Sequence, residues 1–295
     1  MYPILYGLFY LISLLPFRLL YGLSDFCYLF IYKIFGYRKE VVFDNLRRSF
    51  PEKSENEIAR ISSAYYRNLC DMIFETLKLL SISPKQLRKR FVCDLQFLHI
   101  MNQQNKKCQI HLGHQFNWEW ANLYLQLEVQ QPFLVVYMPL SNKAMDKLFK
   151  KIRGRFGGVM IPANDVAHAM QPWHNKAYVS VLVADQNPGN ARRALWFSFL
   201  NQMTAFYKGP EITARRYNAP VFFGEIRKIK RGLYHASMSP IAAQPDLLPA
   251  GKITAEFVRR LEAEIRNYPS NWVWSHRRWK HTFHPNYETL TDSHP

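Results

Sequence analysis

The chain has 295 residues, of which 48% are hydrophobic and 15% aromatic, and this excludes a disordered protein and allows one large domain or two small ones. Lysine and arginine outnumber aspartate and glutamate by 39 to 22, which gives a formal net charge of +17. This surplus predicts a polyanionic partner, either nucleic acid, anionic lipid or a phosphorylated substrate. The four cysteines are widely spaced without a CxxC pair, which favours reduced thiols in a reducing compartment.

The first 36 residues are strongly apolar. No charged side chain occurs from Tyr2 to Phe17, and only Arg18 and Asp25 interrupt the apolar character before Tyr32. Since a spanning helix needs about 20 residues, the segment predicts a single membrane-spanning anchor or a helical hairpin in the membrane interface. A buried helix of a soluble core is the alternative. No basic region precedes the segment and no small-residue cleavage site follows it, which argues against a secretory signal.

A cluster of basic residues follows this segment, consisting of Lys33, Arg38, Lys39, Arg47 and Arg48. Basic residues beside a hydrophobic segment stay on the cytoplasmic side of a membrane, and they attract anionic lipid. The sequence therefore predicts a membrane anchor at residues 1–36 and a catalytic body that faces the cytoplasm.

Residues 37–104 are predicted to form a helical region that packs on the core. Ser54 and Glu57 have the spacing of a capping box. Apolar residues then recur every three or four positions from Ile58 to Leu77, which predicts a helix. Pro84 suits the first turn of the next helix.

Residues 105–295 alternate between strand and helix patterns. The predicted strands are 108–112, 133–137, 158–161, 177–184, 195–199, 221–226 and 233–238, and the predicted helices are 118–127, 143–153, 165–170, 210–217 and 253–268. This alternation predicts an α/β core with a mixed central sheet flanked by helices. Ligands of such sheets bind at the carboxyl ends of strands, where His114 and Asp185 fall.

His114 and Glu119 are a candidate catalytic pair. On one helix, residues five apart lie about 140° apart. The predicted strand–turn–helix context allows them to meet, so that the carboxylate orients an imidazole able to deprotonate an attacking hydroxyl. Spacing alone favours a buried structural histidine and a solvated glutamate. His111 and His114 also permit a zinc site, but no third ligand lies within reach in the sequence, so no metal is expected.

Four short blocks occur in order along the chain. They are residues 113–120 (GHQFNWEW), residues 137–143 with 152–157 (YMPLSNK and IRGRFG), residues 183–189 (VADQNPG) and residues 272–280 (WVWSHRRWK). The set resembles the lipid A biosynthesis (lauroyl/myristoyl) acyltransferases, a branch of the lysophospholipid acyltransferase superfamily. The resemblance extends over nearly the whole chain, and its specificity comes from the order of the blocks.

The resemblance implies that His114 is the general base and Glu119 its partner. Arg153 matches an arginine that contacts phosphate or a developing oxyanion, which suits a guanidinium; from the residues alone it could be a solvated member of a basic helix face. Asp185 matches an acidic residue that binds substrate, or that orients Arg153 or a backbone turn. Gly209 begins a helix whose amides could bind an anion.

The resemblance further implies an acyltransferase at the cell inner membrane of a Gram-negative bacterium. The donor would be an acyl carrier protein or CoA thioester and the acceptor a hydroxyl of a phosphorylated glycolipid, the lipid A precursor, with no cofactor, no metal and no nucleic-acid partner. Met138 departs from the pattern, because many relatives have an arginine there. Acylation of another lyso- or amino-lipid, and a non-catalytic basic membrane-binding protein, are the alternatives.

Overall fold

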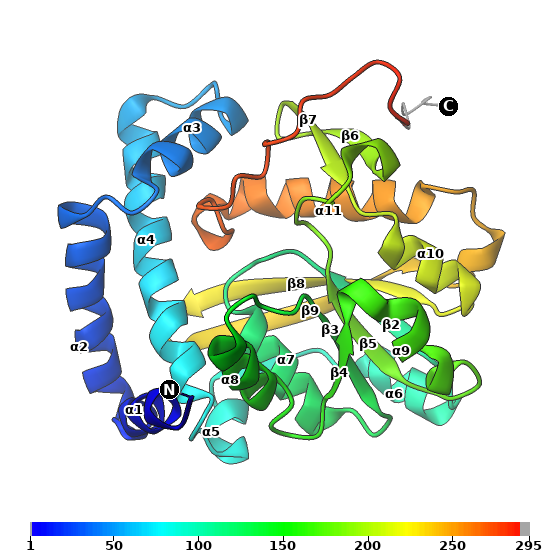
Figure 1. Cartoon of the computed structure of the whole chain (residues 1–295), viewed down its shortest axis with the longest axis horizontal. Helices are drawn as coiled ribbons and strands as arrows, with labels where there is room; N and C mark the ends of the chain where they lie inside the picture. Colours follow the sequence, from blue (N-terminus) through cyan, green and yellow to red (C-terminus); the bar gives the residue numbers. More distant parts are fainter. Residues whose placement is uncertain (1, 290–295) are drawn as a thin grey trace.

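In the computed structural model, which describes residues 2–289, a seven-stranded mixed sheet forms the centre of the protein (Figure 1). The strand order is β1-β9-β8-β2-β5-β3-β4, in which the β8–β9 pair is antiparallel and the other pairs are parallel. The strands are β1 (Phe91–Cys93), β2 (Cys108–Leu112), β3 (Phe133–Tyr137), β4 (Val159–Pro162), β5 (Val179–Val183), β8 (Val221–Lys230) and β9 (Leu233–Ala242). The predicted α/β core with a mixed central sheet is confirmed.

Helices cover both faces of this sheet. Figure 1 shows α7 (Trp118–Glu128) and α11 (Lys252–Asn267) on opposite sides of the β8–β9 pair. A separate antiparallel pair, β6 (Leu195–Phe199) and β7 (Gln202–Phe206), lies beside α11. The remaining helices of the core are α5 (Pro84–Arg88), α6 (Gln96–Gln103), α8 (Lys143–Arg153), α9 (Val166–Ala169) and α10 (Gly209–Arg216).

The predicted elements of the core agree well with the structure, and the differences are informative. β2, β3, β6 and α8 have their predicted bounds. β8 and β9 each extend four residues beyond the prediction, because they pair with each other over most of their length. β1 was not predicted and lies in the region expected to be helical; its three residues become a strand by pairing with Tyr234–Ala236 of β9. β7 was also not predicted, and α6 lies within the region 37–104 that was expected to be helical, although it was not predicted as a separate helix.

Two helices, α3 (Lys39–Ser49) and α4 (Glu55–Lys78), dominate the N-terminal region. The predicted capping box of α4 is present, since the Ser54 backbone N–H donates to Glu57 at 2.9 Å and the Glu57 backbone N–H donates to Ser54 Oγ. As predicted, Pro84 occupies the first turn of α5. The capped α4 is the long support against which the N-terminal helices pack.

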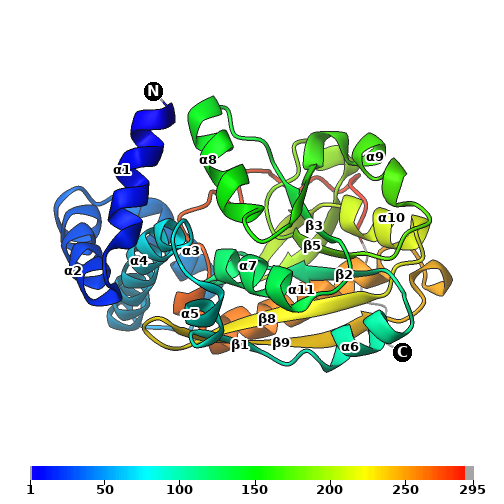
Figure 2. The ribbon, with the colours of Figure 1, turned by 90° about the horizontal axis from the view of Figure 1, so that it is seen from below.

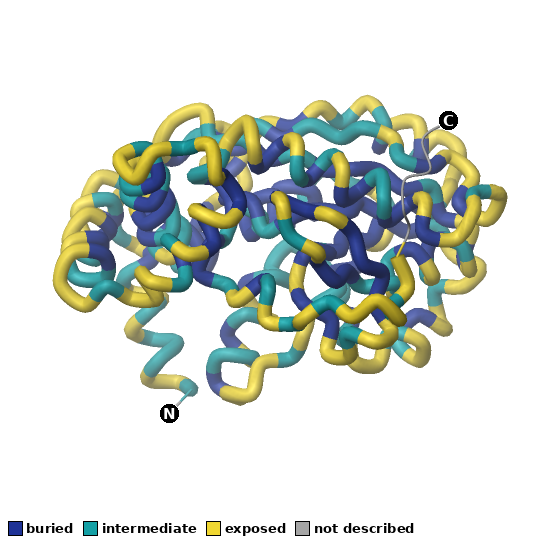
Figure 3. The backbone as a smooth tube through the Cα atoms, turned by 90° about the horizontal axis from the view of Figure 1, so that it is seen from above, coloured by how far each residue is buried: buried dark blue, intermediate teal, exposed yellow. Residues whose placement is uncertain are grey.

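The chain begins with α1 (Tyr2–Leu14) and α2 (Phe17–Tyr28), which continues into the π-helical segment η1 (Leu29–Ile34). α1 lies beside α8 (Figure 2), and Lys147 and Lys151 of α8 contact the rings of Tyr2 and Tyr6. Much of the N-terminal segment is exposed (Figure 3). No single helix among residues 2–289 is long and apolar enough to cross a bilayer; Tyr2–Leu14 and Phe17–Ile34 have the required length and composition only together, with a bend of 116°.

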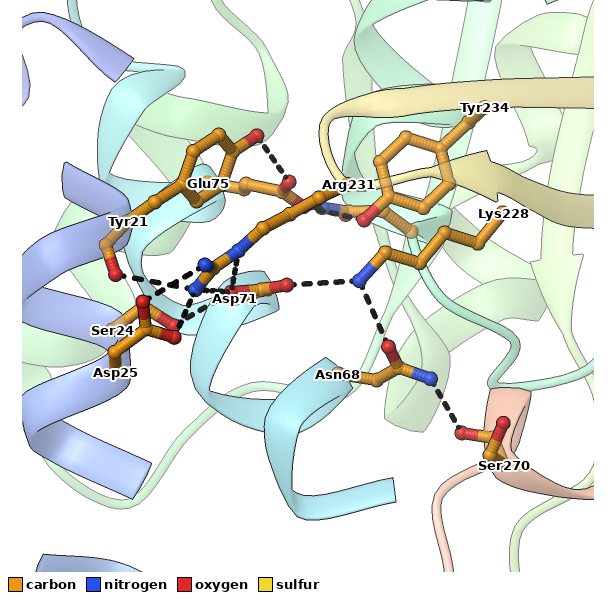
Figure 4. A network of polar contacts seen from close by, with 11 residues as sticks. Tyr21, Ser24, Asp25, Asn68, Asp71, Glu75, Lys228, Arg231, Tyr234 and Ser270 are labelled. Carbon is orange, nitrogen blue, oxygen red and sulfur yellow. Dashed lines mark hydrogen bonds and ion pairs between the residues drawn. The ribbon is translucent and has the colours of Figure 1, made fainter. Parts of the chain in front are cut away.

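A polar network fixes α2 and α4 to the β8–β9 hairpin (Figure 4). At its centre, the buried carboxylate of Asp71 accepts hydrogen bonds from Ser24 at 2.7 Å, Lys228 at 2.8 Å and Arg231 at 2.6 Å. Arg231 also donates to Asp25 of α2 at 2.7 Å. Because these contacts join segments far apart in the sequence, the placement of α2 depends on the complete tertiary structure.

Glu75, one turn further along α4, connects the same region to the start of α7. Its buried carboxylate accepts hydrogen bonds from Tyr21 (2.9 Å), Asn117 (2.9 Å) and Tyr234 (2.7 Å). Burial raises the pKa of Glu75. Asn117 is the N-cap residue of α7, so Glu75 holds the first turn of the helix that carries Glu119.

Replacing Glu75 by alanine should lower the free energy of unfolding by about 3 kcal/mol or more, because the buried donors of Asn117 and Tyr234 and the half-buried hydroxyl of Tyr21 lose their acceptor at about 1 kcal/mol or more each. The matched variant Glu75→Gln should be nearly as stable as the wild type. Its amide oxygen can accept from Asn117 and Tyr234, and its amide group can donate to the Tyr21 hydroxyl. Denaturation of the full chain in neutral detergent measures both. Equal destabilisation by the two substitutions would contradict the hydrogen-bond explanation.

Candidate active site

The order of the parallel strands places two polar residues side by side at one edge of the sheet. β2 and β5 are neighbours in register, with Leu112 opposite Val183, and the backbone N–H of Ala184 donates to the carbonyl of Leu112 at 2.9 Å. The residues that follow these two strands are therefore adjacent, and they include His114 and Asp185. Gly113 allows Leu261 of α11 to pack closely on this turn, because a Cβ atom at position 113 would lie 2.5 Å from the Leu261 side chain.

Asp185 holds His114 by two hydrogen bonds. The backbone N–H of His114 donates to Asp185 Oδ2 at 2.8 Å, and His114 Nδ1 contacts Asp185 Oδ1. Trp272 Nε1 also donates to Oδ2, at 2.6 Å. Burial would raise the pKa of Asp185, but the electrostatic interaction with His114 and the hydrogen bonds from His114 and Trp272 outweigh it and lower that pKa to about 2. Asp185 is therefore an ionised carboxylate with fixed geometry.

The other ring nitrogen of His114 is available for chemistry. Because Nδ1 faces a carboxylate, it carries the proton, and Nε2 is then the unprotonated nitrogen. Nε2 lies 3.0 Å from the side-chain nitrogen of Gln186, which can donate to it. The Trp118 ring packs edge-on at 5.0 Å between centroids. The side chain of His114 is 17% exposed, so a substrate can reach Nε2.

Glu119 has a different partner from the one predicted. Its carboxylate accepts hydrogen bonds from Arg153 Nε at 3.0 Å and Nη2 at 2.5 Å, and from Trp118 Nε1 at 3.1 Å. Among residues 2–289 it makes no hydrogen bond with His114, and the carboxylate that contacts the imidazole is that of Asp185. The reason is the fixed start of α7, where Asn117 caps the helix, and the first turn directs Glu119 towards α8.

Arg153 ends α8 and is held by α7. Its backbone carbonyl accepts from the side chains of Asn122 at 3.1 Å and Gln126 at 2.6 Å. Burial lowers the pKa of its guanidinium, but the charge and hydrogen bonds of Glu119 outweigh burial, and the net pKa is raised. Nη1 is the guanidinium nitrogen without a hydrogen bond to residues 2–289. Arg153 is thus a fixed cation with one side free for an anion.

An apolar pocket of about 370 Å³ opens beside these residues. His114, Glu119, Arg153 and Gly209 line it, whereas Asp185 lies behind His114 and is 2% exposed. The five predicted site residues are therefore brought together around one pocket. Aliphatic side chains of β2, β3 and β5 form part of the pocket wall, namely Leu112, Val135, Val136, Val181, Leu182 and Val183. Met138, the departure noted above, also lines it and is 53% exposed.

The whole arrangement can be compared with known protein families. The model of the bacterial lipid A biosynthesis acyltransferases matches residues 3–281. The chain belongs to this family. In a comparison with curated proteins, no sequence matched the chain. The resemblance predicted from the ordered blocks is thereby confirmed, and membership supports an acyltransferase that uses an acyl donor and a lipid acceptor.

Three residues that contact His114 or Asp185 were not predicted as site residues of this member of the lipid A acyltransferase family. Gln186 contacts His114, Trp118 packs on it and Trp272 donates to Asp185. All three lie inside the ordered blocks, and that position was a signal in the sequence. No local pattern predicted the contact of Trp272 with Asp185, because it joins residues 87 apart.

The neighbouring histidine, His111, has a different environment. It lies within β2, and burial lowers its pKa to about 3, so it is neutral. Among the described residues, no group of three or more His, Cys, Asp or Glu side chains is arranged to hold a metal ion. His114 is therefore the histidine whose position suits proton transfer at the pocket.

Proposed function

We propose that this protein transfers a fatty acyl chain from a thioester to a hydroxyl of a lipid A precursor, with His114 as the general base. The observation that carries the proposal is the geometry of His114. Its Nδ1 is bound by the buried Asp185, and its Nε2, which contacts the side-chain amide of Gln186, lies at an apolar pocket. A base in this tautomer can accept the proton of an acceptor hydroxyl.

The proposed reaction needs no covalent intermediate on the protein. The acceptor hydroxyl gives its proton to His114 Nε2 as its oxygen attacks the thioester carbonyl. The resulting tetrahedral oxyanion collapses, the C–S bond breaks, and His114 returns the proton to the leaving thiolate. Arg153 stabilises the oxyanion or binds a substrate phosphate through Nη1, and Glu119 keeps the guanidinium in place. The Gly209 amide, at the start of α10, offers a further anion contact.

The aliphatic pocket suits the acyl chain, since burial of each CH₂ contributes about 0.8 kcal/mol. The substitution Val181→Phe should fill part of the pocket floor, because Val181 lines it and is 4% exposed. We expect kcat/KM to fall more for long-chain than for short-chain donors. The ratio of the two rates, measured on one preparation, is insensitive to losses in the amount of folded protein. An unchanged ratio would contradict the assignment of the chain to this pocket.

The donor and the acceptor are proposed from charge. The net charge of +17 complements an acidic acyl carrier protein and a phosphorylated glycolipid. We propose acyl carrier protein as the donor, with acyl-CoA as the alternative. Association with an acidic protein falls steeply with ionic strength. The rate with acyl carrier protein thioester should therefore decrease more from low to high salt than the rate with the CoA thioester.

We also propose that the N-terminal helices attach the protein to the cytoplasmic face of the inner membrane. Large apolar side chains on these helices and directly after them are exposed, with exposures such as 79% for Ile4, 65% for Leu11, 62% for Phe26 and 76% for Phe35. Such a surface fits a bilayer interface better than water. Removal of residues 1–36 would expose the surface of α4 on which these helices pack. The substitutions Leu11→Ser and Phe26→Ser are therefore a better test of whether the protein fractionates with membranes.

Mass spectrometry of lipids tests the function directly. A strain that lacks this protein should contain lipid A with one acyl chain fewer, and wild-type protein should restore that chain. The His114→Ala variant should be produced at the same level without restoring it. An unchanged number of acyl chains in the deletion strain would redirect the assignment to another lipid acceptor.

A further inference from the structure

A second, basic pocket lies away from His114, at the corner between α1 and α2. It has a volume of about 370 Å³ and is bounded by Phe17, the end of α5 and the tip of the β8–β9 hairpin. Four cationic side chains line it, namely Lys89, Arg90, Lys230 and Arg231, and no acidic residue does. Four positive charges around one concave surface favour an anionic ligand.

Within residues 2–289, Arg231 is the one of these four cations that forms ion pairs. Arg231 donates to Asp25 and Asp71, and these contacts make it a fixed wall of the pocket (Figure 4). Lys89, Arg90 and Lys230 form no ion pair with an acidic residue in the described part of the chain. Three positive charges without an acidic partner therefore lie together around this pocket.

Arg90 is pre-organised for an anion. Its guanidinium stacks on the Phe17 ring at 3.6 Å from the centroid, and its Nη1 donates to the carbonyl of Gly232 at 3.2 Å. Gly232 has a φ of 72°, and a Cβ atom there would lie 2.1 Å from the Tyr21 hydroxyl. Only glycine allows the hairpin tip to approach this closely, so backbone geometry contributes to the shape of the pocket.

The segment that carries Phe17 also exposes apolar side chains. Phe17 begins α2, and its neighbours in the chain, Leu14 and Leu19, are 52% and 56% exposed. The corner itself is held by Lys78, which donates to the carbonyls of Ser13 at 2.7 Å and Leu15 at 2.9 Å. An anion site beside an exposed apolar corner matches a molecule with a charged head and an apolar tail.

We propose that this pocket binds the phosphate of a membrane phospholipid, with its acyl chains on the exposed corner of α1 and α2. The chemistry of the headgroup is a phosphate monoester or diester held by Lys89, Arg90 and Lys230. The site is separate from acyl transfer. It gives the protein a specific lipid contact in addition to the general attraction between its basic surface and an anionic membrane.

The test compares two double variants of the full chain in neutral detergent. K89A/K230A removes two exposed cations from the pocket. K106A/K176A removes two exposed lysines from another pocket, near the amino ends of β2 and β5, with the same change in net charge. Titration calorimetry with dihexanoyl phosphatidic acid should show one site per chain in the wild type. We expect K89A/K230A to weaken this binding roughly tenfold or more, and K106A/K176A to change it less than about threefold.

Three results would overturn the proposal. Equal weakening by both double variants would show that only the overall charge matters. Inorganic phosphate that binds as tightly as dihexanoyl phosphatidic acid would show a site for free phosphate, with no role for the lipid. Absence of saturable binding to the wild type would remove the site altogether. The His114→Ala variant should bind the lipid normally, so failure here and failure of the proposed acyl transfer are distinguishable.

Discussion

The His114→Ala variant should transfer acyl chains about 10²–10⁴-fold more slowly than the wild type, because it lacks the general base. The fold should persist, since the side chain lies at the pocket and not within the core. Release of thiol from an acyl carrier protein thioester, measured with the purified chain and a lipid A precursor, gives the rate.

A second histidine provides the matched control for this experiment. His99 is exposed on α6, and neither the pocket nor the Asp185 contacts include it. The His99→Ala variant should retain the wild-type rate. If His114→Ala also retained it, His114 would not be the base, and the function would need another group at the pocket.

The Asp185→Asn substitution should also lower kcat by about 10²–10⁴-fold, through the tautomer of His114. Asp185 Oδ2 accepts from two fixed donors, the His114 backbone N–H and Trp272 Nε1. The asparagine oxygen therefore occupies this position, and its NH₂ group faces His114 Nδ1. Nδ1 must then accept, the proton moves to Nε2, and the nitrogen at the pocket can no longer act as a base.

A double-variant comparison separates Asp185 from Glu119. If Asp185 acts through His114, Asp185→Asn should add little loss to the His114→Ala variant, because residues that act as a unit are not additive. Glu119→Gln should instead be coupled to Arg153, whose guanidinium it holds at 2.5–3.0 Å. If the loss of rate from Asp185→Asn were additive to that of His114→Ala, and the loss from Glu119→Gln were not, Glu119 would be the partner of His114.

The expected effect of Asp185→Asn depends on the contact between His114 and Asp185, which local sequence patterns cannot specify. His114 and Glu119 are five residues apart, and spacing made their pairing plausible. Asp185 is 71 residues from His114, and it becomes the partner because β5 lies next to β2 in the sheet. Strand order depends on how all the helices and strands pack together, so this neighbour was visible only in the tertiary structure.

The sequence by itself determined the mixed α/β class, the strand–turn–helix position of His114, the capped α4, and the ordered blocks that identify the family. These features depend on residue periodicity and on capping over a few residues, which are local effects. The tertiary structure decided that β1 joins the sheet, that Glu119 pairs with Arg153, and that Phe17, the end of α5 and the β8–β9 tip enclose a basic pocket. Each of these results from contacts between segments far apart in the sequence. The free energy of such contacts depends on both segments, so no short stretch of sequence can predict them.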